Sequence, residues 1–231
     1  NMSFDPKTPE IKKLCESQIG NETKLTWETT LLNGEHESDE MKDCNIIGNL
    51  MENILYKFIS KRIPTFEKGP PGQKPDFRNL ESETISYDYE LKCFKKERGP
   101  GFDIGSITGF LRDISKPNGV QEKLSVKYLI FEYDMTSIGS TITDFWMLSV
   151  YDICCGYGGG KPINIGGQNG VNIRPATKNQ WTDEKSKEKR NPTNFLDRIE
   201  KLIQSKWYKV DESEKQLTLE SIQTQRKDIG F

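Results

Sequence analysis

Two carboxylates and an amine fall within a short span of this sequence. Asp76 follows Pro75, and Glu90-Leu91-Lys92 comes after a gap of thirteen residues. Carboxylate oxygens suit Mg²⁺, which proteins commonly hold through one or two carboxylates, with water and phosphate oxygens completing the shell. A bound ion of this kind activates water and neutralises charge, while an ammonium group helps to orient or deprotonate the water. The set therefore predicts Mg²⁺-assisted hydrolysis of a phosphodiester, with Asp76 and Glu90 as metal ligands and Lys92 beside the water.

The segment from residue 86 to residue 94 must position two of these groups, and its pattern predicts a strand. Side chains alternate between the two faces of a strand. One face is then apolar, formed by Tyr87, Tyr89, Leu91 and Cys93. Glu90 and Lys92 share the opposite face, which we expect to lie in water, as on a half-buried strand.

The elements around this strand predict a mixed α/β fold. Residues 44–63 carry an apolar stripe at helical spacing, and Pro64 ends that helix. Residues 126–134 and 142–155 are nearly continuous apolar runs that predict two further strands. Residues 194–207 form an amphipathic helix with Asn194 or Thr193 as its cap. Apolar strands interleaved with amphipathic helices indicate a central β-sheet flanked by helices.

The pattern Pro75-Asp76…Glu90-Leu91-Lys92 resembles the PD…(D/E)xK motif of the nuclease superfamily that includes most type II restriction endonucleases. The resemblance spans roughly residues 44–207. It implies a mixed sheet flanked by helices, metal binding by Asp76, Glu90 and the backbone carbonyl of Leu91, and positioning of the attacking water by Lys92.

The resemblance also draws attention to Glu52 on the helix that precedes the motif strand. In many of the resembling nucleases a glutamate on this helix points toward the metals, and Glu52 matches it by position. The alternative interpretation is a solvated helix glutamate.

A glycine-rich stretch at residues 156–170 is a candidate DNA-recognition region. It is no P-loop, because Pro162 follows Gly160-Lys161. Amide and guanidinium groups are the types that pair with adenine and guanine edges, and glycine lets backbone approach a groove. The candidate DNA-binding residues are Lys161, Asn164, Gln168, Asn169, Asn172, Arg174 and Lys178. We expect recognition loops at about residues 156–190; a flexible, exposed connection is the alternative.

Composition narrows the classes of protein to which this chain could belong. A formal net charge of −2 argues against a protein that coats nucleic acid non-specifically, but permits a local basic cleft. The single histidine, His36, lies in an acidic stretch expected to be a loop, which disfavours histidine-based hydrolases. Five cysteines show no zinc spacing and suggest reduced thiols in a cytoplasm. No apolar run approaches 18 residues, so no membrane span is expected.

We therefore expect a sequence-specific double-stranded DNA endonuclease of the restriction type, with Mg²⁺ as cofactor. Residues 1–43 are predicted to be an N-terminal arm, 44–210 the nuclease domain and 211–231 a polar tail. The resemblance implies a homodimer that cuts a short, near-palindromic site, and a cognate DNA methyltransferase in the same system. Two alternatives stay open: a nuclease of the same superfamily acting in repair or on branched or modified DNA, and a non-catalytic DNA-binding module.

Overall fold

The computed structural model describes residues 5–24, 26–30, 36–40, 44–70, 74–136, 139–156, 161–167 and 170–231. The chain forms two compact units, each assembled from separate segments. The sheet unit comprises residues 5–99 and 128–147, and the helical unit comprises residues 100–127 and 148–231. None of the helices in the described ranges is long and apolar enough to cross a membrane.

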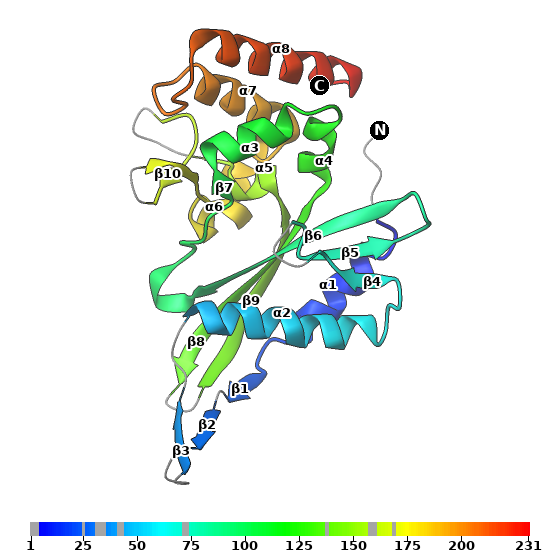
Figure 1. The fold of residues 1–231 in the computed structure, drawn as a ribbon, viewed down its shortest axis with the longest axis vertical. Helices are drawn as coiled ribbons and strands as arrows, with labels where there is room; N and C mark the ends of the chain where they lie inside the picture. The colour runs from blue at the N-terminus through cyan, green and yellow to red at the C-terminus, as the bar shows by residue number, and fades with distance from the viewer. Residues whose placement is uncertain are drawn as a thin grey trace. The chain divides into compact units, whose positions relative to one another are not determined.

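The sheet unit is built on a six-stranded sheet in the order β1-β9-β8-β6-β5-β4 (Figure 1). The strands are β1 (Glu22–Lys24), β4 (Phe66–Lys68), β5 (Phe77–Leu80), β6 (Ser86–Lys95), β8 (Lys127–Thr136) and β9 (Gly139–Ser149). Strand β1 is antiparallel to β9, and β4, β5 and β6 form an antiparallel series. The predicted mixed sheet flanked by helices is confirmed. The motif strand, predicted over residues 86–94, is β6.

Helices α1 (Thr8–Glu16) and α2 (Cys44–Ser60) belong to this unit, and the short helix η1 (Lys96–Arg98) follows β6. Met51, Leu55 and Ile59 repeat every four residues on α2, and all three are buried in the sheet's hydrophobic core. Ile11 of α1 joins the same core. The helix predicted over residues 44–63 is confirmed, and it ends three residues earlier than expected.

A two-stranded ribbon, β2 (Thr26–Thr30) and β3 (His36–Glu40), completes the described part of the sheet unit. The acidic stretch around His36 was expected to be a loop, and that expectation is wrong for residues 36–40. These residues pair with β2 along their whole length, so backbone pairing overrides the low strand propensity of an acidic segment.

The helical unit contains most of the remaining helices and a small three-stranded sheet (Figure 1). Its helices are α3 (Ile107–Ile114), α4 (Gly119–Ser125), α5 (Val150–Ile153), α6 (Lys178–Thr182), η3 (Glu184–Lys189), α7 (Pro192–Ile203) and α8 (Glu212–Asp228). Its sheet has the order β10-β11-β7, formed by Ile165–Gly166, Asn172–Ile173 and Gly105–Ser106. Arg226 of α8 binds Asp197 at 2.7 Å and Glu200 at 2.9 Å, which ties α8 to α7.

Two element boundaries differ from the sequence prediction. The strand expected over residues 142–155 ends at Ser149, whose backbone N–H donates to Asp152 at 3.0 Å and so begins α5. Helix α7 is capped by Asn191, whose side chain accepts from the Asn194 N–H at 2.8 Å, and not by Asn194 or Thr193. Local side-chain to backbone bonds determine both boundaries.

The outer segments contribute to the two units. The described part of residues 1–43 supplies α1, β1, β2 and β3 to the sheet unit. Helix α8, with 17 residues, occupies most of the predicted polar tail in the helical unit. The division into an arm, a nuclease domain and a tail stays a prediction.

A buried carboxylate links the start of the chain to the sheet. Asp5 is 6% exposed; its Oδ2 accepts from the Tyr89 hydroxyl at 2.6 Å, and the Asn79 amide donates to both of its oxygens at 2.9 and 3.0 Å. Burial and the bond to Asp5 raise the pKa of Tyr89, so its hydroxyl remains a donor at neutral pH.

Replacing Asp5 with alanine should lower the free energy of unfolding by about 3 kcal/mol, because two buried donors would lose a charged acceptor. Denaturant unfolding of the purified protein measures this change. The control is Glu10→Ala on α1, which removes an exposed pair with Lys7 and an acidic group in the first turn of the helix, and should cost less than about 1 kcal/mol. Equal effects of the two substitutions would contradict the structural role of Asp5.

Candidate active site

Strands β5 and β6 bring Asp76 and Glu90 to the same place in the sheet. Phe77 pairs with Tyr89 in the antiparallel register, so one further step puts Asp76 opposite Glu90. Residues directly opposite in an antiparallel pair have their side chains on the same face. The loop that precedes β5 therefore delivers one carboxylate to the face of β6 that carries the other.

The Asp76 carboxylate is held in position by the backbone of β6. Its Oδ2 accepts a hydrogen bond from the Leu91 N–H at 2.7 Å. An ionised carboxylate has about four acceptor positions, so one bond to the backbone leaves capacity for a cation. Asp76 thus lies beside the Glu90-Leu91-Lys92 segment, as its proposed role requires.

Glu90 carries its charge in an almost fully buried position. The residue is 3% exposed, and its Oε2 lies 3.3 Å from the Lys92 ammonium. The expectation that this face of the strand lies in water is therefore wrong at Glu90. A buried carboxylate is costly unless it is paired, and the Lys92 ammonium supplies the compensation.

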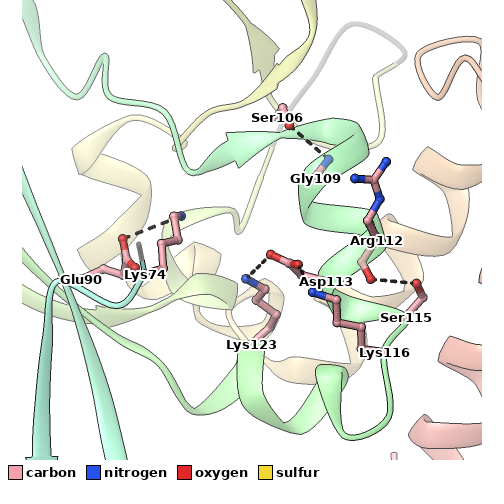
Figure 2. Close-up of polar contacts among 9 residues, drawn as sticks. All are labelled: Lys74, Glu90, Ser106, Gly109, Arg112, Asp113, Ser115, Lys116 and Lys123. Atoms are coloured by element: carbon pink, nitrogen blue, oxygen red, sulfur yellow. Dashed lines mark hydrogen bonds and ion pairs between the residues drawn. The ribbon is translucent and has the colours of Figure 1, made fainter. Parts of the chain in front are cut away.

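A second ammonium reaches the same oxygen. Lys74 Nζ is 3.7 Å from Glu90 Oε2, and Figure 2 shows its side chain directed at that carboxylate. The Lys74 side chain is 52% exposed, whereas that of Lys92 is 18% exposed. Lys74 was not among the predicted site residues; it lies two residues before Asp76, and the pairing of β5 with β6 brings it close to Glu90.

Cys93, the next residue on β6, is no candidate nucleophile. Burial raises the pKa of its thiol to about 12; the nearby Lys92 ammonium opposes the rise and the Asp76 carboxylate adds to it. A thiol that stays protonated at neutral pH is a poor nucleophile. The reactive groups of this site are therefore two carboxylates and amines.

Glu52 lies on α2, and its side chain pairs with a lysine of β4. Its Oε1 lies 3.1 Å from Lys68 Nζ of β4, and the same ammonium donates to Asn53 Oδ1 at 2.7 Å. Strand β4 is separated from β6 by β5. A contact between Glu52 and a metal ion stays a prediction.

The described DNA-binding candidates lie in the helical unit. Asn164 donates to the Pro175 carbonyl at 2.6 Å, Lys161 Nζ lies 5.0 Å from the centre of the Trp207 ring, and Lys178 begins α6. The structure brings together Asn172 and Arg174, because both donate to Asp103. Gln168 and Asn169 lie outside the described residues. Contact of these side chains with DNA stays a prediction.

The oxygen donors at β5 and β6 suit a hard cation. Across the described ranges, no three His, Cys, Asp or Glu side chains form a cluster that could enclose a metal ion. Mg²⁺ does not require such a cluster, because it keeps several waters and is often bound through one or two carboxylates. Asp76, Glu90 and the Leu91 carbonyl supply oxygen donors of the type that such an ion uses.

Comparison with known proteins identifies the family and the fold. A family model described as NgoBV restriction endonuclease matches residues 32–226. Among solved structures, the NlaIV restriction endonuclease has a TM-score of 0.72 and 23% sequence identity, over 100% of this chain and 92% of that one. The search of curated proteins found no match. The family match covers most of the chain, and the structural match shows the same fold. The chain therefore belongs to the NgoBV restriction endonuclease family, and it is a type II restriction endonuclease, a sequence-specific nuclease with DNA as its substrate.

Proposed function

We propose that this nuclease hydrolyses phosphodiester bonds in both strands of a short double-stranded site, depends on Mg²⁺, and uses Asp76, Glu90 and Lys92 for the reaction. One observation carries the proposal: Asp76 binds the Leu91 N–H while the buried Glu90 pairs with Lys92. Restriction endonucleases generally use a divalent metal ion, and these oxygen donors suit Mg²⁺.

The two carboxylates and the Leu91 carbonyl would hold the ion. When bound, Mg²⁺ would lower the pKa of water and offset the charge that develops on the phosphate. Asp76 is fixed by its backbone bond, so little ordering is needed when a cation binds. Glu90 is shielded from solvent, which strengthens its attraction for a positive charge.

Lys92 is proposed to position the attacking water. Its side chain is 18% exposed and is held 3.3 Å from Glu90 Oε2, so its ammonium has a restricted range of positions. An ammonium group has three donors, and the one used for Glu90 leaves others for water or a phosphate oxygen. This role requires an amine held in a fixed position, which the pairing with Glu90 supports.

The remaining parts of the proposal concern partners. A homodimer would match a two-fold symmetric site. A cognate methyltransferase would protect the host's own sites, without contact between the two enzymes. Cys15, Cys93, Cys154 and Cys155 are free thiols, which supports a reducing, cytoplasmic location.

The first test is a plasmid digest. With Mg²⁺ the enzyme should give discrete fragments whose sequenced ends share one short site, and with EDTA it should give none. Asp76→Ala and Glu90→Ala should lower the cleavage rate about a hundredfold or more, because each removes a cation ligand. Full activity of the double variant would contradict the site, and a smear or cutting confined to branched DNA would favour a repair-type nuclease.

A comparison of two lysines on β6 tests the role of Lys92. Lys92→Ala should abolish cleavage and leave affinity for DNA nearly unchanged, because it removes a group needed at the transition state. The matched control is Lys95→Ala, since Lys95 is 21% exposed and pairs with Glu97 instead of Glu90. Cleavage assays and binding titrations separate the two effects. Equal loss of cleavage in both variants would argue against a specific role for Lys92.

Lys74 should compete with a divalent cation for Glu90. Lys74→Gln should tighten Mg²⁺ binding by about two- to fivefold, since a partly exposed charge pair is worth up to about 1 kcal/mol. Calorimetric titration of the DNA-free protein with Mg²⁺ measures the change. Lys12→Gln is the control, because Lys12 is 54% exposed and pairs with Glu16 at the same 3.7 Å distance. Weaker binding in Lys74→Gln would mean that Lys74 does not oppose the cation.

A further inference from the structure

A carboxylate just before β7 connects two of the candidate DNA-binding residues. Asp103 Oδ2 accepts from the Asn172 amide at 2.8 Å, and Asp103 Oδ1 accepts from Arg174 Nε at 2.9 Å. The Asp103 side chain is 43% exposed and that of Arg174 is 33% exposed. One accessible acid therefore holds an amide and a guanidinium side by side.

The small sheet explains why these two side chains meet. Asn172 and Arg174 are two residues apart around β11, so they lie on the same side of the chain. The residue between them, Ile173, is fully buried, which turns its two neighbours toward the surface. Strand β11 is antiparallel to β7, and the Ile104 N–H donates to the Ile173 carbonyl at 2.9 Å. This pairing brings Asp103 alongside β11.

Two glycines leave the space that the pair occupies. A Cβ atom at Gly166 would lie 2.6 Å from Arg174 Cδ, and a Cβ atom at Gly167 would lie 3.0 Å from Asn172 Nδ2. Gly167 also has φ of +81°, a backbone conformation that favours glycine. The glycine pair at the end of β10 is therefore matched to the positions of Arg174 and Asn172.

We propose that Asp103 is a positioning residue that orients Arg174 and Asn172 to read bases in the recognised DNA site. The inference rests on the proposed DNA-binding role of those two residues and assigns their support to Asp103. The bond from Arg174 uses Nε, so the two terminal nitrogens that pair bidentately with a base edge do not take part in it. The bond from Asn172 uses Nδ2 and leaves Oδ1 outside the interaction.

This arrangement favours base reading over general phosphate attraction. A carboxylate reduces local positive charge and so weakens non-specific binding. It also fixes a long side chain before DNA arrives, which lowers the ordering cost of a directional contact. An acid that binds the reading residues therefore increases discrimination between sites.

The experiment measures discrimination directly. The wild-type protein first selects duplexes from a random pool, without divalent cations so that no strand is cut. The selected duplexes define a preferred site, and a scrambled version of that site serves as the comparison duplex. Asp103→Ala should lower affinity for the preferred duplex about tenfold. Affinity for the scrambled duplex should stay the same or rise, because a negative charge is removed. Simple destabilisation would lower both affinities together.

A glycine substitution tests the same arrangement independently. Gly166→Ala should also lower the ratio of preferred to scrambled affinity, since the added methyl group displaces the Arg174 side chain. In an Arg174→Ala background the same substitution should have no further effect, as in a double-mutant cycle. Gly101→Ala is the control, because a Cβ atom at Gly101 would meet nothing within 4 Å.

Asp113→Ala is the control for Asp103→Ala. Asp113 is 41% exposed and pairs with two cations, Lys116 at 2.8 Å and Lys123 at 3.2 Å (Figure 2). The Asp113→Ala substitution should leave the ratio of preferred to scrambled affinity unchanged. An unchanged ratio in Asp103→Ala, or tighter binding of both duplexes, would overturn the role of Asp103 while leaving the nuclease proposal intact. A random pool that yields no preferred site would overturn both.

Discussion

The burial of the Glu90 carboxylate determines which groups must surround it. Glu90 is 3% exposed, so its charge has almost no contact with water and must be balanced by protein groups. Lys92 and Lys74 both approach Oε2, at 3.3 and 3.7 Å. The approach of two ammonium groups to one oxygen shows that this carboxylate attracts cations, which is the property that a divalent cation requires of its ligand.

Most of the fold around this position could be predicted from the sequence. Alternation in β6, the apolar run in β8 and the four-residue repeat of α2 are local patterns that a helix or strand imposes directly. The burial of Glu90 could not be predicted in the same way. Alternation indicates which residues share a face, whereas burial depends on what covers that face, and this is decided by chain segments far away in the sequence.

The functional residues likewise divide into those that the sequence pattern could predict and those that it could not. The Asp76, Glu90 and Lys92 set could be recognised because three residue types at a given spacing point to one kind of chemistry. Lys74 could not, because its approach to Glu90 depends on the path of the loop before β5. The contact of Asp103 with Arg174 in the helical unit could not be predicted either, because the two residues are 71 positions apart in the sequence. Contacts of this length carry no periodic signal, and only the strand pairing creates them.

Cations paired with acids are found in both units of this slightly acidic protein. The net charge is −2, yet attraction to phosphate depends on the charges near the duplex. Lys74 and Lys92 share Glu90, and Arg174 shares Asp103, so part of the positive charge is balanced by neighbouring acids. Cations paired with acids attract a polyanion weakly from a distance. They bind it well only where its phosphates or bases are positioned to contact them directly. An enzyme that must ignore most sequences gains more from this arrangement than from an excess of positive charge.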